Sequence, residues 1–262
     1  MARDFRTHEP GLPEPGTWLT VYVPALVYPL MIATIFVWYD FWYFMKDKEG
    51  GIEWVAIVTI LVGVGYGVTA LAKYRSAFPK KWLTVWFSLG VAGMIVFAGE
   101  EMSWGQHLGF WGGEDIPEGF RELNDQNETN IHNLVGIGNA IDRGSTNAIV
   151  GGTFFAFVIL PFIQRAKRET MSFTNPGYWF WPTRAGLVAG LGVLLIRFPE
   201  RIYMWTTGAE STPFDWRHSE IHEFYIGLLM TIYMVSLHHR LKAYATGETS
   251  GSSAYEKPAP GA

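Results

Sequence analysis

Uncharged apolar stretches alternate with short polar segments along most of this chain, a pattern typical of a polytopic membrane protein. A helix needs roughly 20 apolar residues to cross a hydrocarbon core of about 30 Å. By this criterion we expect six spans, at residues 15–39, 54–72, 82–99, 144–164, 185–196 with its flanks, and 221–237. The sequence therefore predicts an all-α transmembrane helix bundle of about six spans.

Proline and glycine modify the first two expected spans. Pro24 and Pro29 lie inside span one, where neighbouring helices can satisfy the backbone groups that proline frees, so we expect a kinked helix. Gly63, Gly65 and Gly67 lie inside span two, where small residues let helix backbones approach closely. We therefore expect span two to pack tightly against another helix.

The fifth span is shorter than the others. Only residues 185–196 lack charge, which is too short to cross the bilayer, so the helix must include Arg197 or extend through Arg201. Either these arginines reach the interface along their aliphatic stems, or they turn inward as counter-ions for Glu100 or Glu101. The sequence leaves both alternatives open.

The basic residues indicate how the spans are oriented, because cytoplasmic loops are enriched in lysine and arginine. Such residues occur between spans two and three, between spans four and five, and after span six: Lys73, Arg75, Lys80, Lys81, Arg165, Lys167, Arg168, Arg184, Arg240 and Lys242. We therefore expect both termini to be cytoplasmic. A single transmembrane domain is expected over residues 1–245, followed by a flexible Gly/Ser/Pro-rich tail over 246–262.

The loop after span three is strongly acidic. Between residues 100 and 143 the chain has nine acids and only two bases, Arg121 and Arg143. Ionisable groups at or near membrane depth are costly and therefore mark candidate functional sites. Apolar residues recur at helical spacing after the polar run, which predicts a helix over 128–142 that lies in the membrane interface.

Composition narrows the functional classes. The chain has no cysteine, which excludes a disulfide framework, a thiolate nucleophile and an iron–sulfur cluster. Its formal net charge is only −4, and no basic stripe with interleaved aromatic residues is present, so nucleic acid is not an expected partner. With 49% hydrophobic and 16% aromatic residues, the chain is expected to contact membrane lipid directly.

A second polar cluster, at residues 218–223, precedes span six. His218 and His222 are four residues apart, so on a helix they project from one face at a spacing that suits two imidazole ligands of one metal ion. The simpler alternative is a pair of interfacial histidines hydrogen-bonded to backbone. The acidic loop is expected on the same side of the membrane and can supply further ligands or a general base. These candidates are His107, His132, Glu101, Glu128 and Glu223.

Two segments of the acidic loop resemble a protein family. Residues 100–106 read EEMSWGQ and residues 126–133 read QNETNIHN. They are similar to a group of bacterial integral membrane proteins that share an E-E-x-S-W-G-Q motif and a Q-x-E-x-N-x-H-N motif. The resemblance implies a bacterial inner-membrane location and a joint role for the matching residues, and it supplies no reaction. Those residues are Glu100, Glu101, Ser103, Trp104, Gln106, Gln126, Glu128, Asn130, His132 and Asn133.

Four positions also resemble the alkaline ceramidase and adiponectin-receptor superfamily of membrane hydrolases. In that superfamily S-x3-H and H-x3-H motifs and an aspartate hold a zinc ion, which activates water for hydrolysis of a lipid amide. The matching pairs are Ser103 with His107 and His218 with His222. The resemblance implies that these histidines bind zinc and that Ser103 and Asp115 orient the water or the oxyanion. That superfamily has seven spans, whereas six are expected here.

Two classes of function follow. The first is a metal-dependent hydrolase, with zinc as the expected metal, that acts on a lipid-like amide or ester at the outer face. Its ligands would be His132, His218 and His222, and its general base Glu101 or Glu128. The second is a non-catalytic accessory subunit of a larger membrane complex of respiratory or photosynthetic type, whose aromatic surfaces contact partner subunits. A proton or ion pathway is disfavoured, because the cytoplasmic halves of the spans carry almost no charge.

Overall fold

The computed structural model describes residues 14–46, 50–111, 117–118, 129–130, 138–167, 173, 175–209, 212 and 218–247. Every regular element in this part of the chain is a helix, as the sequence predicts. Five helical segments are long and apolar enough to cross a membrane: Trp18–Val37, Gly51–Ala77, Lys81–Glu101, Arg143–Ile163 and Pro176–Thr207. The chain is therefore an integral membrane protein with several spans.

The helices fall into two groups, before and after residues 112–137, most of which lie outside the described residues. The first group is η1 (Trp18–Tyr22), α1 (Val23–Val37), α2 (Tyr39–Lys46), α3 (Gly51–Tyr74), η2 (Arg75–Ala77), α4 (Lys81–Glu101) and η3 (Ser103–Leu108). The second group is α6 (Gly138–Phe154), η4 (Phe155–Ile159), α7 (Leu160–Lys167), α8 (Pro176–Phe180), η5 (Arg184–Gly186), α9 (Leu187–Leu195), α10 (Phe198–Thr207) and α11 (His218–Thr246).

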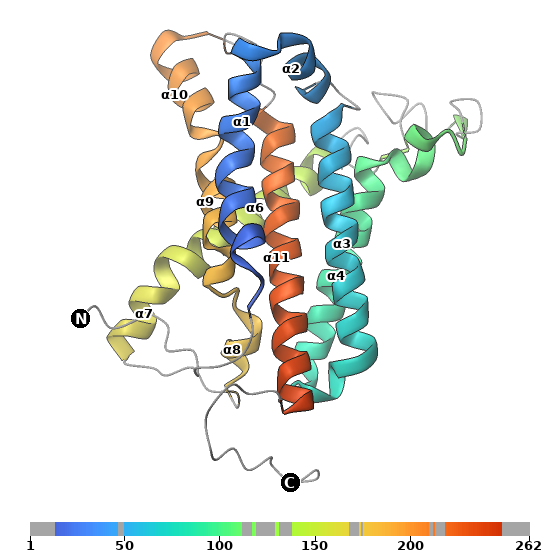
Figure 1. The fold of residues 1–262 in the computed structure, drawn as a ribbon, viewed down its shortest axis with the longest axis vertical. Coiled ribbons are helices and arrows are strands. Elements are labelled where there is room, and N and C mark those ends of the chain that lie inside the picture. Colours follow the sequence, from blue (N-terminus) through green and yellow to red (C-terminus); the bar gives the residue numbers. More distant parts are fainter. Residues whose placement is uncertain are drawn as a thin grey trace.

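Helix α11 is 29 residues long and lies at the centre of the bundle (Figure 1). It packs most extensively on α3 and next on α9, while α3 also packs on α4. This helix contains the expected sixth span but is not among the five segments that are long and apolar enough to cross a membrane. The physical reason is its position, because a helix enclosed by protein can carry buried polar side chains such as Thr231, Ser236 and Arg240. The count of six spans stays a prediction.

Helices α3 and α11 approach each other closely along a glycine-lined seam. A Cβ atom added at Gly63 would lie 2.9 Å from the Cα of Thr231. The same approach lets the Thr231 hydroxyl donate a hydrogen bond of 2.8 Å to the carbonyl of Thr59. A Cβ atom added at Gly67 would lie 2.5 Å from the side chain of Val91 in α4 and 3.4 Å from that of Met234 in α11, whereas one added at Gly65 would have nothing within 4 Å. Tight packing of span two is thus confirmed for two of its three glycines.

The first span is helical over Trp18–Val37, close to the predicted residues 15–39. It begins with the wide π turn η1, and Pro24 explains this turn, because proline has no N–H to donate to the carbonyl of Thr20 one turn earlier. Tyr225 of α11 donates a hydrogen bond of 2.6 Å to the carbonyl of Pro24. This bond joins α11 to the proline-containing span. The carbonyls that Pro24 and Pro29 leave without a donor belong to Thr20 and Ala25, so their satisfaction by neighbouring helices and the expected kink stay predictions.

The fourth and fifth spans also follow the sequence pattern. Helices α6, η4 and α7 form the fourth, and the fifth runs over Pro176–Thr207, so it passes both Arg197 and Arg201 as its short uncharged stretch required. The helix predicted over 128–142 is described only in part. Residues 138–142 form the first turns of α6, residues 129–130 are described and are not helical, and residues 128 and 131–137 lie outside the described residues. An interfacial helix there stays a prediction.

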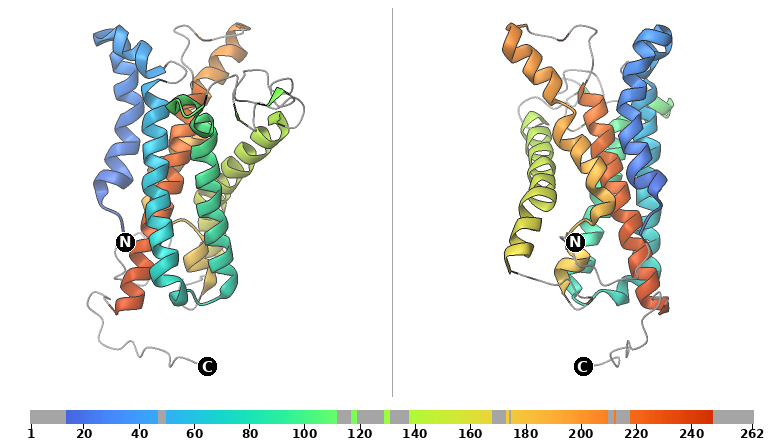
Figure 2. Two further views of the ribbon diagram at one scale, coloured as in Figure 1. Left: turned by 90° about the vertical axis from the view of Figure 1, so that its right-hand side faces the viewer. Right: turned by 60° about the vertical axis from the view of Figure 1, so that its left-hand side comes forward.

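The bundle has two ends (Figures 1 and 2), and their charged residues differ. The basic end comprises the η2 turn, α8 and the C-terminal end of α11, and carries Lys73, Arg75, Lys80, Lys81 and Lys242. The acidic end comprises α2, η3, α10 and the N-terminal end of α11, and carries Glu100, Glu101, Glu200, Glu220 and Glu223. This separation agrees with the predicted sidedness of the loops. Which end faces the cytoplasm stays a prediction.

Candidate functional site

The last turn of α4 and the turn after it form the first part of the candidate site. Gly99 leaves room for the indole of Trp104, because an added Cβ would lie 2.8 Å from that ring. The indole Nε1 donates a hydrogen bond of 2.5 Å to Oε1 of Glu100. Glu100 is only 9% exposed, so this charge-assisted hydrogen bond holds a buried carboxylate in place.

The backbone of this turn is unusual. Ser103 and Trp104 have φ angles of 44° and 51°, and Gly105 has a φ of 103°. A positive φ is costly for residues other than glycine, and strained conformations of this kind cluster at functional sites. Here the strained turn folds Trp104 back onto α4 and buries Ser103 completely.

The two motifs of the acidic loop contact each other. The backbone N–H of Thr129 donates a hydrogen bond of 3.1 Å to Oε1 of Gln106. The Thr129 hydroxyl donates a second hydrogen bond to the carbonyl of Ser103. The next residue, Asn130, is buried. The segment at 129–130 is therefore fastened to the turn after α4, and the two motifs belong to one structural unit.

Three carboxylates from two helices converge beside this turn. Glu101 ends α4, while Glu220 and Glu223 lie three residues apart in the first turns of α11. Each is half-buried and offers a carboxylate oxygen within 4.8 Å of the others. The two polar clusters that the sequence singles out thus meet at the acidic end of the bundle. We call these three residues the acidic triad.

Carboxylates as close as those of the acidic triad repel each other, and positive charge or bound protons offset the repulsion. Each of the three residues already has a polar or electrostatic interaction within the protein, and a bound cation would add to these interactions. A ligand set made only of oxygens favours hard cations such as Mg²⁺, Ca²⁺ and Mn²⁺. In the part of the chain that the structure describes, no other group of three acidic or histidine side chains has this spacing.

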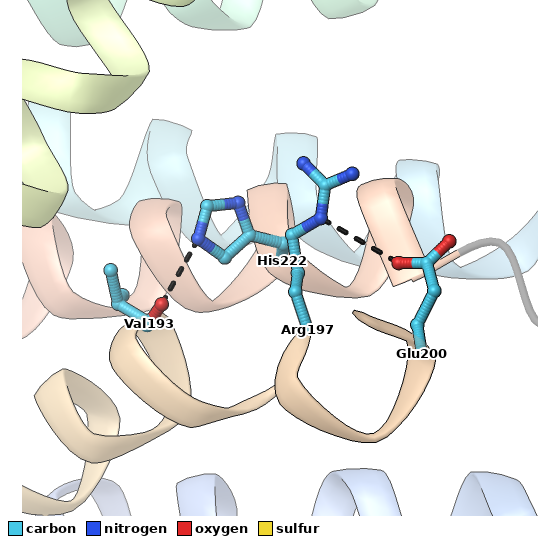
Figure 3. Close-up of polar contacts among 4 residues, drawn as sticks. All are labelled: Val193, Arg197, Glu200 and His222. Atoms are coloured by element: carbon cyan, nitrogen blue, oxygen red, sulfur yellow. Dashed lines mark hydrogen bonds and ion pairs between the residues drawn. The ribbon is translucent and has the colours of Figure 1, made fainter. Parts of the chain in front are cut away.

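His222 has a different environment from the acidic triad and is not a member of it. It is 4% exposed, and its Nε2 lies 3.0 Å from the carbonyl oxygen of Val193 in α9 (Figure 3). Because a carbonyl oxygen only accepts hydrogen bonds, Nε2 carries the proton and donates. The alternative to metal binding that the sequence leaves open is a hydrogen bond to backbone, and His222 makes such a bond. Only its Nδ1 is then available to a metal ion.

Arg197 pairs with an acid of its own segment. Its Nε lies 3.7 Å from Oε2 of Glu200, three residues later in the first turn of α10 (Figure 3). Arg197 therefore has a local ion-pair partner. The two side chains are partly exposed, whereas the paired Nε and Oε2 atoms themselves are buried. The inward alternative, in which Arg197 or Arg201 neutralises Glu100 or Glu101, stays a prediction.

The described residues cover only part of the predicted site. Glu101 belongs to the acidic triad, and Ser103 lies in the buried turn. Glu128, His132 and Asp115 lie outside the described residues, as do the side chains of His107 and His218. The predicted zinc ligands and the predicted base Glu128 therefore stay predictions.

Glu220 is the site residue to which sequence reasoning assigns no role. In residues 218–223 the sequence points first to His218 and His222, because their spacing of four residues suits a metal ion. Yet Glu220 and Glu223 are three residues apart, a spacing that also places two side chains on one face of a helix. That spacing is the signal that identifies the pair, although the contribution of Glu101 depends on tertiary structure.

Comparison with known proteins places the chain in no family. No protein-family model, no curated protein sequence and no solved structure matches it. Its function is therefore inferred from the residues of the acidic end.

Proposed function

We propose that the acidic triad binds a divalent cation at the end of the transmembrane bundle. One observation carries the proposal: half-buried carboxylates of α4 and α11, far apart in sequence, meet with their oxygens within 4.8 Å of one another. Divalent cations bind carboxylate oxygens at about 2.0–2.6 Å, so small side-chain movements would close the site around an ion. The bound ion would join the end of α4 to the start of α11.

The proposed ligands favour a hard cation over zinc. Glu101, Glu220 and Glu223 supply only oxygen atoms, which suit Mg²⁺, Ca²⁺ or Mn²⁺. Zinc would need histidine nitrogens, and the candidates for them are His107, His132 and His218, together with Nδ1 of His222. A zinc site therefore remains the variant of this proposal in which histidines of the acidic loop and of the start of α11 supply the nitrogens.

We further propose that the cation serves hydrolysis of a lipid-like amide or ester at this end of the bundle. A bound cation polarises a carbonyl group and lowers the pKa of a bound water, which is the chemistry that such a reaction needs. With Glu101 as a ligand, Glu128 is the proposed general base. Ser103 is completely buried, so its hydroxyl contributes only if the turn after α4 opens.

Cation binding is tested directly on the purified protein in lipid nanodiscs. We expect Mg²⁺, Ca²⁺ or Mn²⁺ to bind at about one ion per chain in calorimetric titration, and Glu101→Gln or Glu220→Gln to weaken binding at least tenfold. Asp40→Asn, which neutralises an exposed acid of α2 at the same end, is the matched control. Equal binding by all variants would remove the acidic triad as the site.

Hydrolysis is tested separately with ceramide and diacylglycerol presented in the same nanodiscs. Fatty-acid release measured by mass spectrometry should require the cation and should disappear in Glu220→Gln and in Glu128→Gln. Release that persists after chelation would argue against a metal-dependent reaction. Binding without release would leave the cation a structural role.

We also propose that the acidic end lies outside the cytoplasm and that both termini lie inside. The support is the concentration of Lys73, Lys80 and Lys81 at the opposite end, because positive loops are retained in the cytoplasm. The chain has no cysteine, so single introduced cysteines report sidedness cleanly. A membrane-impermeant maleimide should label Asp40→Cys but not Lys80→Cys in intact cells, and the reverse result would invert the topology.

A non-catalytic subunit of a larger complex is the second candidate, and α10 supports it. Phe198, Ile202 and Trp205 form one helix face and are 53%, 54% and 86% exposed, and no residue of α10 is buried. Purification from native membranes distinguishes the candidates. A partner retained at fixed stoichiometry and lost in Trp205→Glu would support the subunit role, and an isolated active chain would refute it.

A further inference from the structure

We infer that the basic end carries a binding site for the headgroup of an anionic phospholipid, between α3 and α11. The inference is independent of the cation proposed at the acidic end. It depends on three features that meet at one place: an exposed apolar row along α3, a pair of lysines, and a cluster of tyrosine and histidine rings.

The apolar row supplies a path for an acyl chain. Val58, Val62 and Tyr66 follow each other at intervals of four residues and therefore line one face of α3. Their exposed fractions are 58%, 48% and 37%, so this face is open to lipid. Lys73 lies two turns beyond Tyr66 on the same face, near the end of the helix. The row thus leads from the middle of the span to a cation.

The rings join this row to α11. The ring of Tyr66 meets the imidazole of His238 edge to face at 5.2 Å between centroids, and Tyr74 meets it at 5.6 Å. His239 follows, with its centroid 5.8 Å from that of His238. Amphipathic rings of this type are favoured at the depth of lipid headgroups. Nδ1 of His238 is buried without a hydrogen-bond partner, so a polar headgroup atom entering between the rings would satisfy it.

Two lysines give the site its charge. Lys73 of α3 and Lys242 of α11 are both exposed and both interact electrostatically with His238. Glu14 lies close to His239, but its carboxylate accepts hydrogen bonds from the hydroxyls of Ser236 and Thr183. A phosphate between the lysines would therefore be attracted by two helices at once. Basic sites between transmembrane helices recognise anionic headgroups in this way.

The ligand class follows from this arrangement. A soluble anion would use the lysines but not the row of Val58, Val62 and Tyr66. A zwitterionic phospholipid would use the row but gain little from the lysines, because its positive group offsets the phosphate. An anionic phospholipid uses both, which is why we assign the site to it.

Lipid retention tests the assignment. The protein is purified in detergent, incubated with dioleoylphosphatidylglycerol or dioleoylphosphatidylcholine, and examined by native mass spectrometry and thermal unfolding. We expect phosphatidylglycerol to be retained and to raise the melting temperature, while phosphatidylcholine does neither. The variant Lys73→Gln/Lys242→Gln should weaken retention roughly tenfold or more. Both side chains are exposed, so the fold should not change.

The matched control removes the same charge at the same end. Lys80→Gln/Lys81→Gln neutralises two exposed lysines, one just before α4 and one at its first residue. It should retain phosphatidylglycerol like the unmodified protein. Equal loss in both double variants would mean that net charge alone attracts the lipid and would overturn the site. Equal stabilisation by inorganic phosphate would also overturn it, because a soluble anion would then be sufficient.

Discussion

The two ends of α11 accommodate buried charge in different ways. At the basic end Arg240 is 0% exposed, and its Nη1 donates a hydrogen bond of 2.6 Å to the carbonyl of Tyr178. Its guanidinium carbon also lies 5.1 Å from the centre of the Tyr178 ring. Among the described residues no carboxylate forms an ion pair with Arg240. Fixed backbone dipoles and an aromatic face therefore stabilise this charge.

At the acidic end, charges of the same sign are brought together instead. The acidic triad gathers three carboxylates from α4 and α11 within 4.8 Å. Removing a charge should therefore have opposite consequences at the two ends. At Arg240 the loss should destabilise the fold whatever ions are present, whereas at the acidic triad the sign should depend on whether a cation is bound.

The largest effect is expected for Arg240→Ala at the basic end. The substitution leaves the carbonyl of Tyr178 without this donor and removes the guanidinium that lies over the rings of Tyr178 and Trp179, so we expect a loss of about 3 kcal/mol. Thermal unfolding in nanodiscs, with and without chelator, measures it. Arg75→Ala, which removes an exposed arginine at the same end, should change stability little. A loss that depends on divalent cations would remove the contrast between the two ends.

Arg240 also shows where sequence reasoning ends. The periodic apolar stretches predict the helices, and the alternation of basic and acidic loops predicts that Glu101 and the start of α11 share one end. In the same scheme Arg240 is only a basic residue after span six. Its burial depends on the carbonyl groups of α8, a segment about 60 residues earlier in the chain whose docking no local pattern specifies.

Tertiary packing, which no local pattern specifies, also decides whether Glu220 or His222 lies beside Glu101. Both lie in one short cluster, and the rotation of α11 decides which of them faces α4. That rotation depends on the close contact of Gly63 with Thr231 and on the packing of α11 against α9. Helical spacing predicts which residues share a face, but it does not predict which neighbour that face meets.

The seam between the ends gives the second prediction. Gly63→Ala places a Cβ within 2.9 Å of the Thr231 backbone, so α3 and α11 must separate, and we expect a net loss of about 2 kcal/mol. Gly65→Ala, where nothing lies within 4 Å, should be neutral or stabilising by up to about 1 kcal/mol. Thermal unfolding of the two variants checks this, and equal stability would mean that the seam does not fix the helix pair.

Trp104→Phe should have a smaller effect, confined to the acidic end. It keeps an aromatic ring against Gly99 but removes the Nε1 donor to Glu100, which should cost about 1–2 kcal/mol. Trp205→Phe, at a highly exposed position of α10, is the control and should leave stability unchanged. If Trp104→Phe also leaves stability unchanged, the buried carboxylate does not depend on this hydrogen bond.

The smallest change in stability is expected for Glu223→Gln without cation, and its sign should reverse when a cation binds. In the presence of chelator, Glu223→Gln removes one of three mutually repelling charges, so the variant should be slightly more stable than the unmodified protein, by about 1 kcal/mol or less because the group is half-exposed. With saturating cation the order should reverse, since a ligand present at 100 times its Kd stabilises the binding state by about 2.7 kcal/mol. Melting temperatures of both proteins across a cation titration should therefore cross. Asp40→Asn is the control and should follow the unmodified protein throughout the titration. Parallel curves for Glu223→Gln would contradict the prediction, because the charges of the acidic triad would then be stabilised by groups of the protein itself, as the charge of Arg240 is.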